Sequence, residues 1–553
     1  MQTTLIHREE AEILEALGRR RPDWLDPFRQ ELPAARLTAC QRLAQALQLE
    51  ELGHPPTLMP AHPDQMLRGL AGYSNEGLER LAAELRQSVV NLALARVFRR
   101  FRQQAFGQRN AVEWAAARSL DDSSFATSTF FEQWVFEGHP LHPVAKLRKH
   151  MPADGWFDWS PEAEAVVRLP LLSIAPSHFR ETGAGLTRCL VEAYPELAPL
   201  AGRRALLAIH PHQLSELGKR YQRWLEDGSV QRIDGPGLAV RPLMSFRSMA
   251  PMDSLTRPHL KTAVDIQLTG AIRTVSPNAA ENGPMLTLLL QQISAREDHF
   301  GGRLVILKEE AAGYFDPPEA GPDRFALQKS LSLLLRQNSE SQVARGQVAM
   351  PAAALIEAAP SGRGLVLDDL LAVYPASPAR FFQDYCQVLV EPLLRLLTLY
   401  GVSLEAHLQN CVMVFEGGRP VRMLYRDFGG VRVAPARLER LGLDTHFHPN
   451  SATLAEDPRE LRNKLFYPLL INHLGQLAQA LTRQGHGSER TWWSQLARQV
   501  ESWAPDLMRS PWGPGDLAAL LGPTLDYKRM TFMRLQEMVV DYSYTKVPNP
   551  LAR

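Results

Sequence analysis

Five polar side chains stand at the two ends of one apolar segment, residues 405–430, EAHLQNCVMVFEGGRPVRMLYRDFGG. They are His407, Gln409, Asn410, Arg426 and Asp427. The apolar residues between them favour two strands, and Gly417, Gly418 and Pro420 predict the turn of a β-hairpin. Such a hairpin returns Asp427 close to Asn410. Taken singly, each polar residue is more often a strand cap. Five of them at the same end of one folded hairpin favour a functional site.

A second polar segment, residues 137–148, reads EGHPLHPVAKLR and contains His139, His142, Lys146 and Arg148. Proline disfavours helix for the residue before it, so both His-Pro steps predict a stiff loop. The two histidines have metal-ligand spacing, but no cysteine or carboxylate triad accompanies them. Cations beside histidines suit an anionic ligand better.

A third segment, residues 244–277, carries cations and hydroxyl groups. Ser245, Arg247 and Ser248 come first, Lys261 is expected to start a strand, and Arg273 with Thr274 is expected to end it. Arginine favours bidentate contacts with phosphate or carboxylate, and lysine supplies a point charge. Together the three segments indicate a nucleoside triphosphate held by cations, with a metal held by Asn410 and Asp427.

Composition limits the kind of protein that carries these residues. The chain has 553 residues, 61 Lys and Arg against 60 Asp and Glu, and a formal net charge of +1. This balance gives no bulk field for nucleic acid or membrane. The four cysteines are far apart, which indicates a reducing compartment, and no apolar run is long enough for a membrane span. We therefore expect a cytoplasmic protein that binds neither nucleic acid nor membrane.

Hydrophobic periodicity divides the chain into three expected regions. Residues 1–125 read as helical, with a core stripe in 76–101. Residues 126–344 mix strands and loops, with a strand at 263–270 and a helix at 326–337. Residues 345–553 combine the hairpin with helices. The expected fold class is α+β.

Four blocks, in this order, resemble the motifs of the IucA/IucC family, the NRPS-independent siderophore synthetases. They are EGHPLHPVAKLR, SFRS, HLKTAVDIQLTGAIRT and the hairpin segment of residues 405–430. KLFYPLLINHL and YKRMTFMRLQEM are also similar to the C-terminal pattern of the family. Only the helical N-terminal region has no supporting motif.

The resemblance implies an enzyme that uses ATP and Mg²⁺ to adenylate a carboxylate, such as citrate or a citrate or succinyl derivative. An amine or hydroxylamine then attacks the acyl adenylate and forms an amide. The implied architecture is a three-lobed cupped hand, with a helical thumb (1–125), mixed α/β fingers (126–344) and a palm with a kinase-like hairpin (345–553). A cytoplasmic homodimer is implied as well.

Site residues are carried over from the motifs. The expected nucleotide-binding residues are Ser245, Arg247, Ser248, Lys261, Arg273, Gln409, Asn410 and Asp427. The expected catalytic residues are His142, Lys261, Arg273 and His407, and the expected metal ligands are Asn410 and Asp427. The expected substrate-binding residues are His139, His142, Lys146 and Arg148.

Two choices stay open at the level of sequence. His142 and His407 are both candidates for the base that takes the proton of the amine. The order His407, Asn410, hairpin and then Asp427-Phe428-Gly429 also resembles the catalytic segments of protein kinases, so a kinase-like phosphotransferase is the alternative function. Against it, the chain has neither a glycine-rich loop before a VAIK-like strand nor an HRD aspartate before Asn410.

Overall fold

Helices form the N-terminal part of the computed structural model, which describes residues 8–319, 321–443, 446–447, 451–538 and 542–552. The hydroxyl group of Ser74 caps the longest helix by accepting a hydrogen bond from the Gly77 N–H, as serine does at helix starts. The expected stripe of this helix is buried, with Leu78 half-buried at its edge. The helices are α1 (Arg8–Arg20), α2 (Leu25–Leu49), α3 (Asn75–Phe106) and α4 (Ala111–Asp121).

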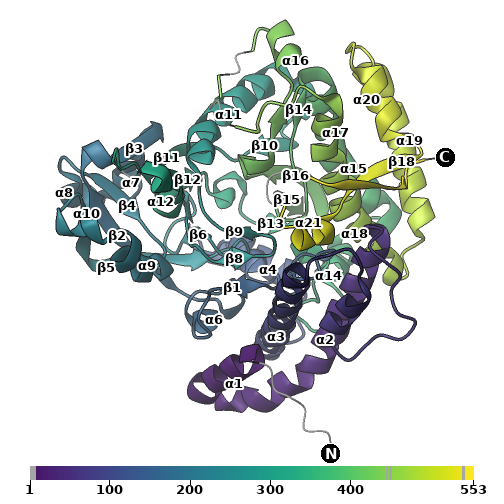
Figure 1. Cartoon of the computed structure of the whole chain (residues 1–553). Coiled ribbons are helices and arrows are strands. Elements are labelled where there is room, and N and C mark those ends of the chain that lie inside the picture. The colour runs from purple at the N-terminus through teal and green to yellow at the C-terminus, as the bar shows by residue number, and fades with distance from the viewer. Residues whose placement is uncertain (1–7, 320, 444–445, 448–450, 539–541, 553) are drawn as a thin grey trace, which may run out of the picture.

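The largest sheet has eight antiparallel strands in the order β3-β11-β12-β7-β6-β5-β2-β4. It occupies one side of the molecule, away from α19 and α20 (Figure 1). Its strands are β2 (Val167–Ile174), β3 (Phe179–Gly183), β4 (Ala205–Ala208), β5 (Val230–Pro242), β6 (Ser248–Pro251), β7 (His259–Thr262), β11 (Glu309–Phe315) and β12 (Ser332–Arg336).

Two predictions in this region were wrong. The expected helix at 326–337 ends early, because α12 covers Arg324–Ser330 and the rest is β12, which lies between β11 and β7. All of β12 is buried, and a continuous apolar run cannot distinguish a buried strand from a helix. The expected strand at 263–270 is broken. Lys261 lies inside β7, and a short hairpin of β8 (Gln267–Leu268) and β9 (Ala271–Ile272) follows, with β8 pairing with β1 (Arg148–Lys149).

The predicted hairpin is confirmed as β15 (Cys411–Glu416) and β16 (Arg419–Tyr425). Its turn is formed by Gly417 and Gly418, both with positive φ, whereas Pro420 lies within β16 at a register shift. The hairpin is the centre of a four-stranded sheet, β10 (Leu304–Ile306), β16, β15 and β13 (Val348–Pro351).

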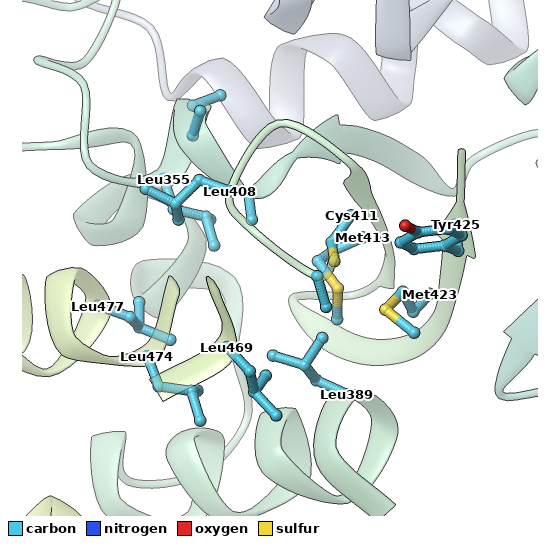
Figure 2. Packing of buried hydrophobic residues seen from close by; sticks show 14 of the residues in the cluster. Leu355, Leu389, Leu408, Cys411, Met413, Met423, Tyr425, Leu469, Leu474 and Leu477 are labelled. Carbon is cyan, nitrogen blue, oxygen red and sulfur yellow. The ribbon is translucent and has the colours of Figure 1, made fainter. Parts of the chain in front are cut away.

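Helices cover one face of this sheet. Met413 and Met423 of the hairpin face Leu389 of the long helix α15 and Leu469 (Figure 2). The helices of this part include α11 (Pro277–Arg296), α14 (Val366–Val373), α15 (Pro378–Arg395), α17 (Pro458–Phe466), the π-helix η11 (Tyr467–Leu474), α18 (Gly475–Arg483), α19 (Glu489–Leu507), α20 (Gly513–Leu520) and α21 (Met530–Leu535). A C-terminal ribbon of β18 (Thr524–Lys528) and β19 (Tyr544–Pro548) completes the fold.

The expected mixture of helices and sheets is thus confirmed. Across the described residues, no helix is long and apolar enough to cross a membrane. One hydrophobic core contains residues from the N-terminal helices, α11, the hairpin and α19, so these elements are packed as one body.

The hairpin turn gives a prediction on stability. A Cβ on Gly418 lies 2.7 Å from the Tyr374 nitrogen and 3.0 Å from the Leu370 oxygen at the end of α14, and its φ is +76°. Gly418→Ala is therefore expected to lower the thermal unfolding midpoint through both overpacking and backbone strain, about 2 kcal/mol or more in unfolding free energy. Gly417→Ala is the matched control, with a φ of +52° and open space around its Cβ. Equal shifts for the two variants would contradict the contact with α14.

Candidate active site

The hairpin places Asp427 beside Asn410, as the sequence predicts. The N–H of Arg426 donates to the carbonyl oxygen of Asn410 at 3.1 Å, so the two strand ends are directly paired. Asp427 then adopts a φ of +74°, and its Oδ1 accepts a hydrogen bond from the Gly429 N–H at 3.3 Å. This local turn directs the carboxylate away from the strand and toward the large sheet.

Arg426 has an architectural role. Its guanidinium group donates to the carbonyl oxygen of Gln409 at 3.0 Å and forms a buried ion pair with Glu132. The other carboxylate oxygen of Glu132 accepts the N–H of Met244 at 3.0 Å. One buried carboxylate therefore links the end of the hairpin to the loop that carries Ser245 and Arg247.

Two strands of the large sheet supply cations to Asp427. Lys261 of β7 lies 3.0 Å from its Oδ1, and Arg336 of β12 lies 3.4 Å from its Oδ2. Both cations also approach Glu309 of β11, at 3.7 Å and 2.8 Å. Because β7, β12 and β11 are neighbours in the sheet, the positions of these charges are fixed by strand pairing. We call Lys261, Glu309, Arg336 and Asp427 the Asp427 cluster.

Two further arginines bring positive charge to this cluster. The field of Asp427 acts on Arg247 and on Arg273, and burial, together with the charge of Arg247, lowers the pKa of Arg273 to about 10. Burial opposes ionisation of Asp427, but Lys261, Arg336 and Arg247 hold its pKa well below the ordinary range. Four cations thus face Asp427 and Glu309, and a third carboxylate, Glu405, also acts on Arg273, so the region keeps a surplus of one positive charge.

A cavity of about 450 Å³ adjoins this cluster. Its walls come from the loop at 137–148, the β8–β9 hairpin, the segment before β15, and α21. Eight of the predicted site residues line it: His139, His142, Lys146, Arg148, Ser245, Arg273, His407 and Gln409. Of the others, Lys261 and Asp427 belong to the cluster, and Ser248 of β6 pairs with Lys261 of β7. Arg247 and Asn410 do not line the cavity; Arg247 lies in the field of Asp427, and the Asn410 carbonyl accepts the Arg426 N–H.

The three histidines of the cavity share one hydrogen-bond pattern. His139, His142 and His407 each accept, at Nδ1, the backbone N–H two residues ahead, at 3.3, 3.2 and 3.2 Å. Burial lowers the pKa of all three, to about 3 for His142. In the neutral ring of His142 or His407 the proton therefore belongs on Nε2. Such a ring is suited to donating a hydrogen bond rather than to accepting a proton.

Lys146 and Arg148 already have an anionic partner. Glu162 lies 2.6 Å from the Lys146 Nζ, and Arg148 binds both of its oxygens at 2.6 and 2.7 Å. All three side chains are buried, and the Arg148 guanidinium lies over the ring of Trp156. With Glu162 the pair keeps a single net positive charge.

Sequence reasoning missed several charged residues of the site. Arg336 and Glu309 belong to the Asp427 cluster, and Glu405, Lys528 and Arg534 line the cavity. Arg336 lies within the segment 326–337, whose pattern predicts a helix. Lys528 and Arg534 lie in YKRMTFMRLQEM, which resembles the family without indicating a role for either. Glu405 begins the hairpin segment, and only its proximity to the cavity identifies it.

A tyrosine lies between two lysines at the same cavity. Lys464 donates to the Tyr542 hydroxyl at 3.2 Å, and the Lys528 Nζ lies 4.1 Å from the ring centre. Burial opposes ionisation of Tyr542, but these two ammonium groups lower its pKa. In the described part of the chain Lys528 forms no ion pair, so this end of the cavity is also positive.

Asn410 and Asp427 fit a metal ion only in part. The oxygens of Asp427 already face two cations, and Asn410 donates through Nδ2 to the Glu405 carbonyl at 3.1 Å, which leaves its Oδ1. The described residues contain no group of three or more His, Cys, Asp or Glu side chains arranged to hold a metal. One carboxylate and one amide suit a Mg²⁺ ion that is also held by phosphate oxygens.

Comparison with known families gives two matches. The model of the IucA / IucC family matches residues 127–357. The model described as ferric iron reductase FhuF-like transporter matches residues 379–542. The first match contains the 137–148 loop and the segment with Lys261 and Arg273, and the second contains the hairpin.

Curated relatives match most of the chain. The D-ornithine–citrate ligase of Staphylococcus aureus is 26% identical over 529 residues, which cover 89% of this chain and 80% of that protein. Staphyloferrin A synthase of the same organism is 25% identical over 449 residues, covering 77% of this chain and 73% of that protein.

Solved structures share the fold. The petrobactin biosynthesis protein AsbB of Bacillus anthracis superposes with a TM-score of 0.79 at 16% identity, covering 99% of this chain and 98% of that chain. ATP-bound aerobactin synthetase IucA of Klebsiella pneumoniae gives 0.71 at 20% identity, covering 87% and 84%.

His142 gives a prediction that needs no substrate. Because its folded pKa is about 3, the ring is expected to stay neutral, with the proton on Nε2, from about pH 8 down to pH 5. The unfolded ring binds a proton at about pH 6.5, so the contribution of this group to stability falls as the pH drops below that value. Nitrogen-15 NMR of labelled histidine measures the tautomer, with His142→Gln to assign the signal. A titration midpoint between pH 5 and 8 would contradict the assignment.

Proposed function

Because the chain belongs to the IucA/IucC family of siderophore synthetases, whose members are acid-amine ligases, we propose that it uses ATP to adenylate a carboxylate and joins the acyl group to an amine. The observation that carries this proposal is the surplus of positive charge where the Asp427 cluster meets the cavity. A polyphosphate and a carboxylate both bind to cations. The Asp427 cluster and the cavity provide two adjoining sites with such cations.

The nucleotide phosphates are assigned to the Asp427 cluster. Lys261, Arg247 and Arg336 offset the phosphate charge, and the Ser245 and Ser248 hydroxyls lie on the adjoining loop and strand. We assign Asp427 and Asn410 to the Mg²⁺ ion that accompanies ATP, which withdraws negative charge from the phosphates. The ATP bound to the aerobactin synthetase of Klebsiella pneumoniae supports this choice of nucleotide.

The carboxylate substrate is assigned to the cavity. Arg273, Lys528 and Arg534 reach it from three elements, the β8–β9 hairpin, β18 and α21. Several cations around one small volume favour a substrate with more than one carboxylate group, such as citrate. The names of relatives that ligate citrate to D-ornithine or to diaminopropanoate agree with this class.

The chemistry then follows from charge. A carboxylate oxygen attacks the α-phosphorus, pyrophosphate leaves, and Arg273 and Lys261 stabilise the negative charge that develops. The amine nitrogen next attacks the acyl carbon, and AMP leaves. His142 and His407, as neutral Nε2–H donors, are better placed to hold an acyl or phosphoryl oxygen than to act as the base.

The reaction order is tested by pyrophosphate exchange. Enzyme, MgATP and citrate are expected to exchange labelled pyrophosphate into ATP without any amine, because activation precedes amine attack. Added hydroxylamine is expected to intercept the adenylate as a hydroxamate, and AMP rather than ADP is expected to accumulate. A panel with succinate and citryl amides measures the preference among carboxylates. Formation of ADP in place of AMP would contradict the proposal and support phosphotransfer.

Asp427→Asn provides the decisive variant in the same assay. The amide keeps the shape of the carboxylate but loses the charge opposite Lys261 and Arg336, so exchange is expected to fall by about 100-fold or more. Asp253→Asn, at an exposed carboxylate that is remote in sequence from the hairpin and whose ion-pair partner is Arg257, is the matched control and is expected to behave as wild type. Near wild-type exchange by Asp427→Asn would remove Asp427 from the site.

A further inference from the structure

One carboxylate of the N-terminal helices contacts Arg534, a residue that lines the cavity, without lining the cavity itself. Glu84 of α3 is 3% exposed, and its Oε2 accepts a hydrogen bond from the Nε of Arg534 at 2.7 Å. A second guanidinium nitrogen of Arg534, Nη2, bonds to the other oxygen of Glu84. The pair is therefore bidentate, the geometry that fixes the plane of a guanidinium group.

Glu84 also contacts a second element of the cavity wall. The Nε2 of Gln267, in β8, donates to Glu84 Oε1 at 3.3 Å. The β8–β9 hairpin carries Thr269 and Arg273, which line the cavity. A single buried side chain thus connects the hairpin wall to the Arg534 wall.

The helix that carries Arg534 is attached to the N-terminal helices through its backbone. Glu50, at the end of α2, accepts the N–H groups of Thr531 and Phe532 at 3.0 and 2.8 Å, which caps the start of α21. Arg80 of α3 donates to the Arg534 carbonyl at 3.0 Å. Accordingly, α21 lies against α3 in Figure 1. The backbone of Arg534 is held independently of Glu84, so Glu84 governs mainly the direction of its side chain.

The third guanidinium nitrogen of Arg534 is available. Its Nη1 makes no hydrogen bond to any residue that the structure describes, while the side chain lines the cavity near Lys528. Resting on the proposed function, we propose that Glu84 is a positioning residue that aims Arg534 at a carboxylate of the acyl substrate other than the one that is activated. The substrate class is then a polycarboxylate, and the N-terminal helices take part in selecting it.

Kinetics of pyrophosphate exchange test this role. With citrate as the probe, Glu84→Gln is expected to raise the KM for citrate by about tenfold or more, because the amide does not hold the guanidinium plane. The KM for ATP is expected to change less than about twofold, since Arg534 lies away from the Asp427 cluster. Glu79→Gln, on the exposed face of α3, is the matched control. An unchanged KM for citrate, or equal increases for citrate and ATP, would overturn the proposal.

A double-mutant cycle separates positioning from general stability. If Glu84 acts through Arg534, then Glu84→Gln adds no further loss to Arg534→Gln, whereas additive losses would overturn the proposal. Should Glu84→Gln fail to fold, Glu84→Asp keeps the charge at shorter reach and must still raise the KM for citrate. If the wild-type enzyme exchanges with no carboxylate of the panel, citryl amides included, the proposed function and this inference both fail. If the wild-type enzyme is active and the Glu84 variants keep the wild-type KM for citrate, only this inference is overturned.

Discussion

The ion pairs of Asp427 with Lys261 and Arg336 join the hairpin to the eight-stranded sheet, and the position of the other groups in the site depends on them. Buried charges cost several kcal/mol each unless they are paired, and removal of one partner leaves the others uncompensated. Here four cations face three carboxylates, Asp427, Glu309 and Glu405, so one positive charge is left for a ligand. An anion that binds between hairpin and sheet completes the charge balance of the fold.

Rigid supports surround this charge. Strand pairing fixes Lys261, Arg336 and Glu309, and the positive φ of Asp427 turns its carboxylate toward them. Glu132 then links the end of the hairpin to the loop before β6 through Arg426 and the Met244 N–H. Buried carboxylates thus connect, through ion pairs and hydrogen bonds, elements that are far apart in the chain. Preorganised positive charge of this kind is what stabilisation of a developing anion requires.

The sequence predicted the parts of the site that lie within one motif. The hairpin and the position of Asp427 beside Asn410 follow from alternating apolar residues and two glycines, and both are local. Arg336, Glu162 and Glu84 were missed because their partners are 14 to 450 residues away along the chain. The helix predicted at 326–337 was wrong for its second half, where three consecutive leucines remove any helical periodicity. In such a segment, pairing with neighbouring strands rather than periodicity determines whether the chain forms a strand or a helix. The homodimer, the cytoplasmic location and the region boundaries at 125 and 344 stay predictions.

Transfer of oxygen from the carboxylate to AMP tests the central claim most directly. If a carboxylate oxygen attacks the α-phosphorus, citrate labelled with oxygen-18 in its carboxylates must deliver one labelled oxygen to AMP for each amide formed. Mass spectrometry of the AMP after complete turnover with an amine measures this transfer. The account predicts one label in AMP and none in pyrophosphate. Unlabelled AMP, or label recovered in inorganic phosphate together with ADP, would contradict it.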